Sequence, residues 1–263
     1  MKKKLPTGIQ SFSDIRNKNY LYVDKTEIIY KMVTEGKVYF LSRPRRFGKS
    51  VLVSTLDALF SGRKELFEGL FIYDKWNWTQ QYPVIRLDFS GLTVKTPVEL
   101  EESLAAFVKS TAIQYDISVL DAPYKFQFGE LIKILHQSTG RQVVVLVDEY
   151  DKPIIDHLSN KETLEANKEI LHDFYQVLKA SDEYIKFIFL TGVSKFSGLS
   201  VFSALNNIVD ITLNRKYAAL CGYTQEELEY YFTDYLDEIA EYECISRNEL
   251  LDKIKFWYNG YSW

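Results

Sequence analysis

Five short apolar runs, rich in β-branched and aromatic side chains, divide the first 213 positions of the chain. They lie at residues 38–41, 84–89, 143–147, 187–190 and 208–213. Runs of this length and composition predict β-strands. The run 143–147 is apolar at every position, which is typical of a central parallel strand that helices cover on both faces.

Helical patterns fill the spaces between these runs. Apolar residues recur at helical spacing in the segments 51–60, 98–113 and 164–178. Because strand and helix alternate along the chain, we expect an α/β fold, built as a three-layer sandwich with a mostly parallel central sheet.

The pattern changes after residue 213. Thr224 with Glu227, and Ser246 with Glu249, have the spacing of capping boxes and precede apolar residues at helical spacing. We therefore expect two helices after the sheet. Eight acidic residues and no Lys or Arg lie between positions 217 and 246, which predicts a solvated helix face.

These patterns divide the chain into a core of residues 1–214 and the start of a small helical lid at residues 215–263. The boundary depends on the change of pattern alone, because no linker or repeat marks it. An aromatic turn around a glycine, at residues 257–263, ends the chain with nothing after it to pack against. We interpret this end as a truncation of a longer parent protein.

Composition excludes several classes of protein. The 263 residues are 46% hydrophobic and 26% charged, with a formal net charge of −4, which excludes a disordered or a polybasic chain. Two cysteines, Cys221 and Cys244, are too few for a disulfide scaffold or a cysteine-rich zinc module. No apolar run approaches the roughly 18 residues that span a bilayer, and no signal-peptide core follows Met1. We expect a cytoplasmic protein without a membrane partner.

The most specific chemistry lies in the turn after the first predicted strand, which ends in Gly48-Lys49-Ser50 and leads into a predicted helix. This is the arrangement of a P-loop, in which backbone N–H groups and a helix N-terminus hold phosphate oxygens. We expect Lys49 to act as a catalytic residue on the β- and γ-phosphates of ATP, and Ser50 to ligate Mg²⁺. The predicted nucleotide-binding residues are Arg45, Arg46, Phe47, Gly48, Lys49, Ser50 and Val51.

The first half of this loop departs from the general P-loop pattern. Arg43 occupies the position of the first glycine, and Pro44 lacks an N–H group. We expect altered loop geometry, with Arg45 and Arg46 giving charge-assisted hydrogen bonds to phosphate. Alternatively, these three arginines form a basic patch that contacts DNA, although phosphate binding in the loop explains their presence more simply.

Two carboxylates follow the apolar run 143–147. Asp148 and Glu149 have the layout of a Walker B motif, in which the first acid holds Mg²⁺ and the second polarises the attacking water. Because ligands of open α/β sheets collect at the carboxyl ends of parallel strands, we expect these acids to lie near Lys49. The prediction is that Ser50 and Asp148 ligate the metal and Glu149 is catalytic.

A third candidate is Thr191, which ends the apolar run 187–190. A strand in this place lies between the Walker A and Walker B strands in ATPases that have an additional central strand. We expect Thr191 to bond the γ-phosphate or the attacking water, with an ordinary turn residue as the alternative.

Several longer segments carry a resemblance to a known family. They include Tyr22-Val-Asp-Lys-Thr26, Ser42-Arg-Pro-Arg-Arg-Phe-Gly-Lys-Ser50, Val147-Asp-Glu-Tyr-Asp-Lys-Pro153, Thr191-Gly-Val-Ser-Lys-Phe196 and Leu205-Asn-Asn207. Together they resemble the bacterial AAA-ATPase-like family, over essentially the whole chain. The resemblance implies a P-loop ATPase core in which Arg43 commonly replaces the glycine, with Lys49 and Ser50 as Walker A and Asp148 and Glu149 as Walker B. It also implies a C-terminal nuclease-like domain of the PD-(D/E)XK superfamily, which this chain lacks and through which DNA is a possible partner.

Other candidate sites are weaker. Tyr22 could stack on adenine and Arg215 could act as a sensor. For both residues we favour the alternative, an ordinary surface side chain. Glu35-Gly-Lys37 has a nuclease-like spacing but lacks a second acid in register. Zinc and a Ser-His-Asp triad are disfavoured, because the three histidines are scattered and no Gly-x-Ser-x-Gly elbow occurs.

The function that these motifs predict is Mg²⁺-dependent ATP hydrolysis that moves the helical lid and a downstream domain. The alternative is a nucleotide-gated interaction module that binds ATP with little hydrolysis, as the Arg43-Pro44 start of the loop allows. A homo-oligomer is a possible partner arrangement, because many such ATPases borrow an arginine from a neighbour. No guanine-type signature occurs, which favours ATP.

Overall fold

The computed structural model describes residues 2–195, 205 and 207–258. A five-stranded sheet forms its centre, with the order β2-β3-β4-β1-β5 and every pairing parallel. The predicted α/β fold with a parallel sheet is therefore confirmed, and β4 lies between β1 and β3 as predicted. The strands are β1 (Val38–Ser42), β2 (Val84–Asp88), β3 (Val143–Asp148), β4 (Ile185–Gly192) and β5 (Val209–Asp210).

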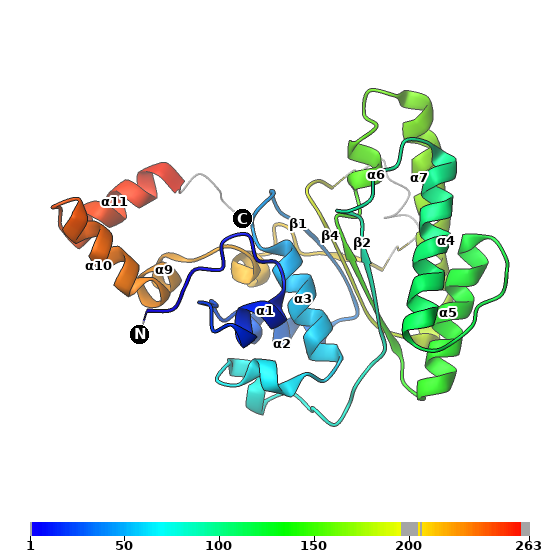
Figure 1. Cartoon of the computed structure of the whole chain (residues 1–263), viewed down its shortest axis with the longest axis horizontal. Helices are drawn as coiled ribbons and strands as arrows, with labels where there is room; N and C mark the ends of the chain where they lie inside the picture. Colours follow the sequence, from blue (N-terminus) through cyan, green and yellow to red (C-terminus); the bar gives the residue numbers. More distant parts are fainter. Residues whose placement is uncertain (1, 196–204, 206, 259–263) are drawn as a thin grey trace.

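Helices cover both faces of the sheet (Figure 1). One layer consists of α4 (Pro97–Gln114), α5 (Tyr124–Thr139) and α7 (Lys161–Ala180). The opposite layer consists of α1 (Phe12–Asn17), α2 (Thr26–Glu35) and α3 (Lys49–Phe60). We call the apolar cluster under α4, α5 and α7 the first core cluster and the one under α2 and α3 the second core cluster.

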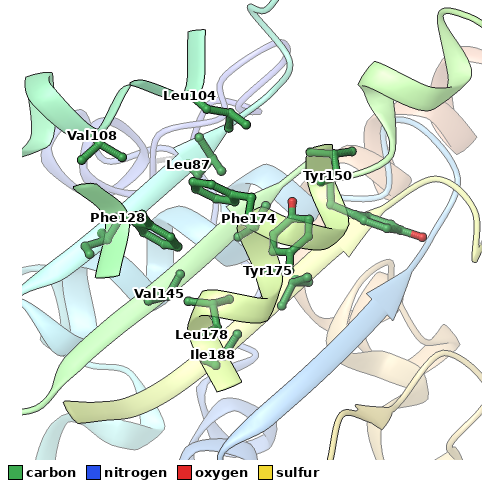
Figure 2. Close-up of a cluster of buried hydrophobic side chains, with 14 of the residues drawn as sticks. Leu87, Leu104, Val108, Phe128, Val145, Tyr150, Phe174, Tyr175, Leu178 and Ile188 are labelled. Carbon is green, nitrogen blue, oxygen red and sulfur yellow. The ribbon is translucent and has the colours of Figure 1, made fainter. Parts of the chain in front are cut away.

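Alternation along β3 explains why this strand is apolar throughout. Val143, Val145 and Val147 pack in the first core cluster, and Val144 and Leu146 pack in the second. Successive side chains of a strand point to opposite faces, so a strand covered on both sides needs an apolar residue at every position. Figure 2 shows the first core cluster between the strands and the helices above them.

Shorter elements connect these layers. The segment between α3 and β2 forms two 3₁₀ turns, and a short helix follows β3. These elements are η1 (Lys64–Phe67), η2 (Phe71–Asp74), α6 (Lys152–Ile155), η3 (Asp182–Tyr184) and η4 (Arg215–Leu220). The three predicted helices correspond to α3, α4 and α7.

Two expectations about the end of the chain are wrong. The run 208–213 yields only the two-residue strand β5, because the Asp210 side chain accepts the Thr212 N–H (2.9 Å) and forms a turn there, although the Ile211 N–H still donates to the Phe40 carbonyl of β1 (2.9 Å). Within residues 207–258, three α-helices follow the sheet instead of two: α9 (Gln225–Tyr231), α10 (Thr233–Tyr242) and α11 (Arg247–Tyr258). Both predicted capping boxes are present, at the starts of α9 and α11.

The helices α9 to α11 form a small cluster of their own. Leu236, Ala240 and Leu250 are buried between them, whereas Tyr217 and Cys221 still belong to the second core cluster. The division of the chain at residues 214 and 215 stays a prediction. Of the aromatic turn, residues 259–263 lie outside the described part, as do Phe196 and Asn206. None of the helices in the described ranges is long and apolar enough to cross a bilayer.

Candidate functional site

The loop between β1 and α3 ends in an uncapped helix start. Gly48 is the N-cap residue, with a φ of +87° in the left-handed region that favours glycine, and no described side chain caps α3. The first N–H to bond within the helix is that of Leu52, to the Gly48 carbonyl at 3.0 Å. The N–H groups of Lys49, Ser50 and Val51 therefore lie at a positive helix terminus, the backbone arrangement that binds anions.

The Lys49 side chain lies under this loop. It is 5% exposed, and its Nζ donates to the carbonyls of Arg43 (3.0 Å) and Pro44 (3.1 Å). Burial lowers the pKa of Lys49, and the charges of Asp148 and Glu149 oppose this shift. The loop thus holds a buried ammonium group beside the two carboxylates at the end of β3.

Arg43, at the position of the first P-loop glycine, is a structural residue. It is fully buried, and its Nη1 donates to the carbonyls of Ser42 (2.9 Å) and Thr212 (2.7 Å), which ties β1 to the turn after β5. The alternative of a DNA-binding patch that includes Arg43 is wrong, because a buried side chain cannot contact DNA. Arg45 and Arg46 are exposed, and Arg46 has a positive φ of 69°.

Phe47 connects the loop to the C-terminal helices. Its ring lies so close to Gly222 that a Cβ there would be 3.7 Å from the Phe47 Cδ1. Gly222 has a φ of +81° and lies two positions before Thr224, the N-cap residue of α9. The start of the C-terminal segment therefore contacts the loop directly.

Asp148 ends β3 with a fully buried carboxyl group. Its Oδ1 accepts the Glu149 N–H at 3.0 Å, and its Oδ2 has no hydrogen-bond partner among the described residues. Burial raises the pKa of Asp148, and the neighbouring Ser50 hydroxyl opposes this rise. A buried acceptor without a donor costs free energy, so a cation or its water fits this oxygen.

Glu149 follows in an unusual backbone conformation. Its φ is +51°, in the left-handed region, and its side chain is half-buried. Non-glycine residues in this region store of the order of 1 kcal/mol of strain and cluster at functional sites. Its charge acts on both Asp148 and Lys49, so it lies close to both.

Asp151 belongs to the same constellation, although its sequence position alone did not reveal it. It is 1% exposed, and its Oδ2 accepts the N–H groups of Val193 (2.9 Å) and Ser194 (2.8 Å). Burial raises the pKa of Asp151, and these two N–H groups oppose the rise. The aspartate therefore fixes the chain after β4 against the turn after β3.

The contact also explains Gly192. A Cβ at this position would lie 2.5 Å from the Asp151 Oδ1 and 2.6 Å from the Tyr150 Cδ1, in a fully packed region. We expect Gly192→Ala to destabilise the protein by about 1–3 kcal/mol through overpacking, measured by urea denaturation. Gly91→Ala is the control, because no atom of the described residues lies within 4 Å of a Cβ there. Equal stability of the two variants would contradict this packing.

Three other predicted residues have different environments. The buried Thr191 hydroxyl donates to the Leu41 carbonyl at 2.8 Å, so in this conformation its proton is used within the sheet. The Tyr22 ring packs edge-on against Phe12, with centroids 5.1 Å apart, and burial raises its pKa. Arg215 is exposed. Neither environment tests the adenine-stacking role of Tyr22 or the sensor role of Arg215, so the preference for ordinary packing stays a prediction.

The N-terminal segment clamps the C-terminal helices onto the core. The buried Lys25 ammonium donates to Glu227 Oε1 at 2.6 Å, and the Asp24 N–H donates to the Tyr231 hydroxyl at 3.3 Å. Glu227 is also the capping-box acid of α9. Further along, the Tyr235 hydroxyl donates to the Lys3 carbonyl at 2.9 Å.

The two cysteines can report on this clamp. Burial raises the pKa of the Cys221 thiol to about 11, whereas Cys244 is exposed. At pH 8, a pKa of that size leaves ~100-fold less thiolate than an ordinary thiol has. We expect N-ethylmaleimide to modify Cys244 quickly and Cys221 very slowly, as followed by mass spectrometry.

Glu227→Ala is expected to accelerate the modification of Cys221, because it removes the acid that pairs with Lys25 and frees α9 from the core. The Cys244 rate in the same sample is the internal control. If the Cys221 rate is unchanged in Glu227→Ala, this ion pair does not hold the segment closed.

Two comparisons relate the chain to known proteins. Residues 6–202 match the model of a family described as predicted AAA-ATPase. The chain is also 42% identical, over 263 residues, to a protein of Azotobacter chroococcum described as "Uncharacterized protein in vnfD 5'region". The match covers 100% of this chain and 49% of that protein, so the chain spans about half the length of its relative.

Proposed function

The chain belongs to the predicted AAA-ATPase family, and from this membership we propose that it binds ATP with Mg²⁺ at the loop between β1 and α3 and hydrolyses it. One observation carries the proposal. The uncapped N-terminus of α3, with the buried Lys49 beneath it, adjoins a buried carboxylate, Asp148, whose Oδ2 has no hydrogen-bond partner in the part of the chain that the structure describes. Anion-binding and cation-binding groups side by side are what a metal-bound triphosphate requires.

Each residue then has a separate task. The N–H groups of residues 45–51 bind the phosphates, and Lys49 exchanges its bonds to the loop carbonyls for bonds to the β- and γ-phosphate oxygens. Ser50 and Asp148 would hold the Mg²⁺ ion, which when bound neutralises charge on those oxygens. Glu149 orients and polarises the water that attacks the γ-phosphate. In this assignment Arg45 and Arg46 stay exposed donors at the rim.

We propose that nucleotide binding at the loop is coupled to the position of the C-terminal helices through two contacts. Phe47 touches Gly222 at the start of that segment, and Lys25 pairs with Glu227 of α9. A nucleotide that moves Phe47 would shift the equilibrium between clamped and released helices, by the difference in its affinity for the two states. In a protein as long as the relative, of which the chain covers 49%, the remaining length would receive this change, with DNA as a possible target.

Fluorescent ATP and phosphate release test the proposal together. We expect saturable binding of a methylanthraniloyl-ATP that strengthens with Mg²⁺, and phosphate release above the buffer rate. No binding at all would contradict the site. Binding without release, at high protein concentration and with DNA added, would favour the nucleotide-gated module. The hydrogen bond from the Thr191 hydroxyl to the Leu41 carbonyl favours this alternative, because a hydroxyl that donates to the sheet cannot donate to the γ-phosphate.

A further inference from the structure

A third carboxylate, Asp88, ends the strand beside Asp148. In the parallel pairing of β2 with β3, Asp88 is the register partner of Asp148. Neighbouring strands lie about 4.8 Å apart, and register partners in a sheet point to the same face. The two aspartates are therefore adjacent at the carboxyl end of the sheet.

The direction of Asp88 follows from its own strand. Leu87 packs in the first core cluster, under α4 and α5 (Figure 2), so its neighbour faces the other side of the sheet. Arg86, two residues earlier, lies 3.7 Å from Asp57 of α3. Asp88 thus faces the α3 side, where Ser50 and Asp148 meet.

Asp88 is exposed and available. Its Oδ1 accepts the Ser90 N–H at 2.8 Å, and no ion pair within the described residues involves it. Its charge contributes, after burial, to the raised pKa of Asp148, which agrees with their proximity. Beside it, the fully buried Asp148 has an Oδ2 with no hydrogen-bond partner among the described residues, so this oxygen can accept a cation or its water.

We propose that Asp88 is a positioning residue that accepts hydrogen bonds from water molecules of the cation held by Ser50 and Asp148. Mg²⁺ keeps several waters when it binds through one carboxylate and phosphate oxygens, and those waters need acceptors for their protons. A carboxylate one strand away from Asp148 is at the distance of such an outer-shell acceptor. This inference rests on the proposed function of the site.

The test measures metal binding rather than turnover. Mn²⁺ is titrated into the complex of the protein with a non-hydrolysable ATP analogue and followed by electron paramagnetic resonance. We expect Asp88→Asn to weaken Mn²⁺ binding by about tenfold, as outer-shell changes do, with analogue binding in EDTA unchanged. Asp148→Asn should lose more. Asp57→Asn is the matched control, because it removes a carboxylate on the same face that contacts Arg86 instead.

The outcomes separate the two proposals. If the wild-type protein shows no cation-dependent binding of the analogue, the proposed function fails and the role of Asp88 fails with it. If Asp148→Asn weakens Mn²⁺ binding and Asp88→Asn binds Mn²⁺ as Asp57→Asn does, only the role of Asp88 is overturned. Thermal melting identifies a variant that is merely unfolded. If Asp88→Asn is unfolded, the charge-keeping variant Asp88→Glu decides: retained Mn²⁺ affinity supports the role of Asp88, and lost affinity in a folded Asp88→Glu overturns it.

Discussion

Lys49→Met is expected to lower the affinity for ATP by about 100-fold or more, because the variant keeps the volume of the side chain and loses every charge-assisted hydrogen bond to phosphate. The wild-type ammonium donates to the carbonyls of Arg43 and Pro44 from below the loop. A triphosphate offers charged acceptors in place of these neutral ones, so the exchange favours the bound state. Isothermal calorimetry with ATP and Mg²⁺ measures the difference.

Lys31→Met is the control for this experiment, because Lys31 is an exposed residue of α2 that pairs with Glu27 away from the loop. Unchanged affinity in Lys49→Met would contradict the phosphate site. Since the Lys49 ammonium also links two loop carbonyls, circular dichroism and thermal melting should accompany the calorimetry. A folded variant with lost affinity supports the assignment.

Local periodicity was enough to predict the strands β1 to β4 and the helices α3, α4 and α7. It failed where tertiary contacts decide the structure. α5 begins with Tyr124-Lys-Phe-Gln-Phe128, which alternates with a period of two and contains no helical signal until later residues. β5 is short because the Asp210 side chain forms a turn with Thr212, a local bond that its apolar neighbours conceal.

The candidate site divides in the same way. Gly48-Lys49-Ser50 and Asp148-Glu149 were visible because their spacing relative to predicted strand ends is local information. The burial of Arg43 depends on Thr212, 169 positions away, and the role of Asp151 depends on Val193 and Ser194 after a different strand. Such contacts follow from strand order, which the pattern of one sequence specifies only in part.

Glu149→Gln is expected to bind ATP with wild-type affinity and to lower turnover by about 100- to 10,000-fold, the range for loss of a general base. Glutamine has the size of glutamate but cannot accept a proton from the attacking water. The substitution keeps the hydrogen bond from the backbone N–H of residue 149 to the Asp148 Oδ1, so the predicted metal site is unchanged. Binding by calorimetry and single-turnover phosphate release separate the two effects.

Glu183→Gln is the matched control, because Glu183 is an exposed acid near the start of β4, at the other end of the sheet. The left-handed backbone of Glu149 strengthens the prediction. Its φ of +51°, directly after a buried strand, is a strained conformation for a non-glycine residue. This conformation holds the carboxylate in a direction that an unstrained backbone would not provide. Wild-type turnover in Glu149→Gln would leave the strain without this explanation. It would also remove Glu149 from the catalytic residues, and water activation would then have to come from another group near the γ-phosphate.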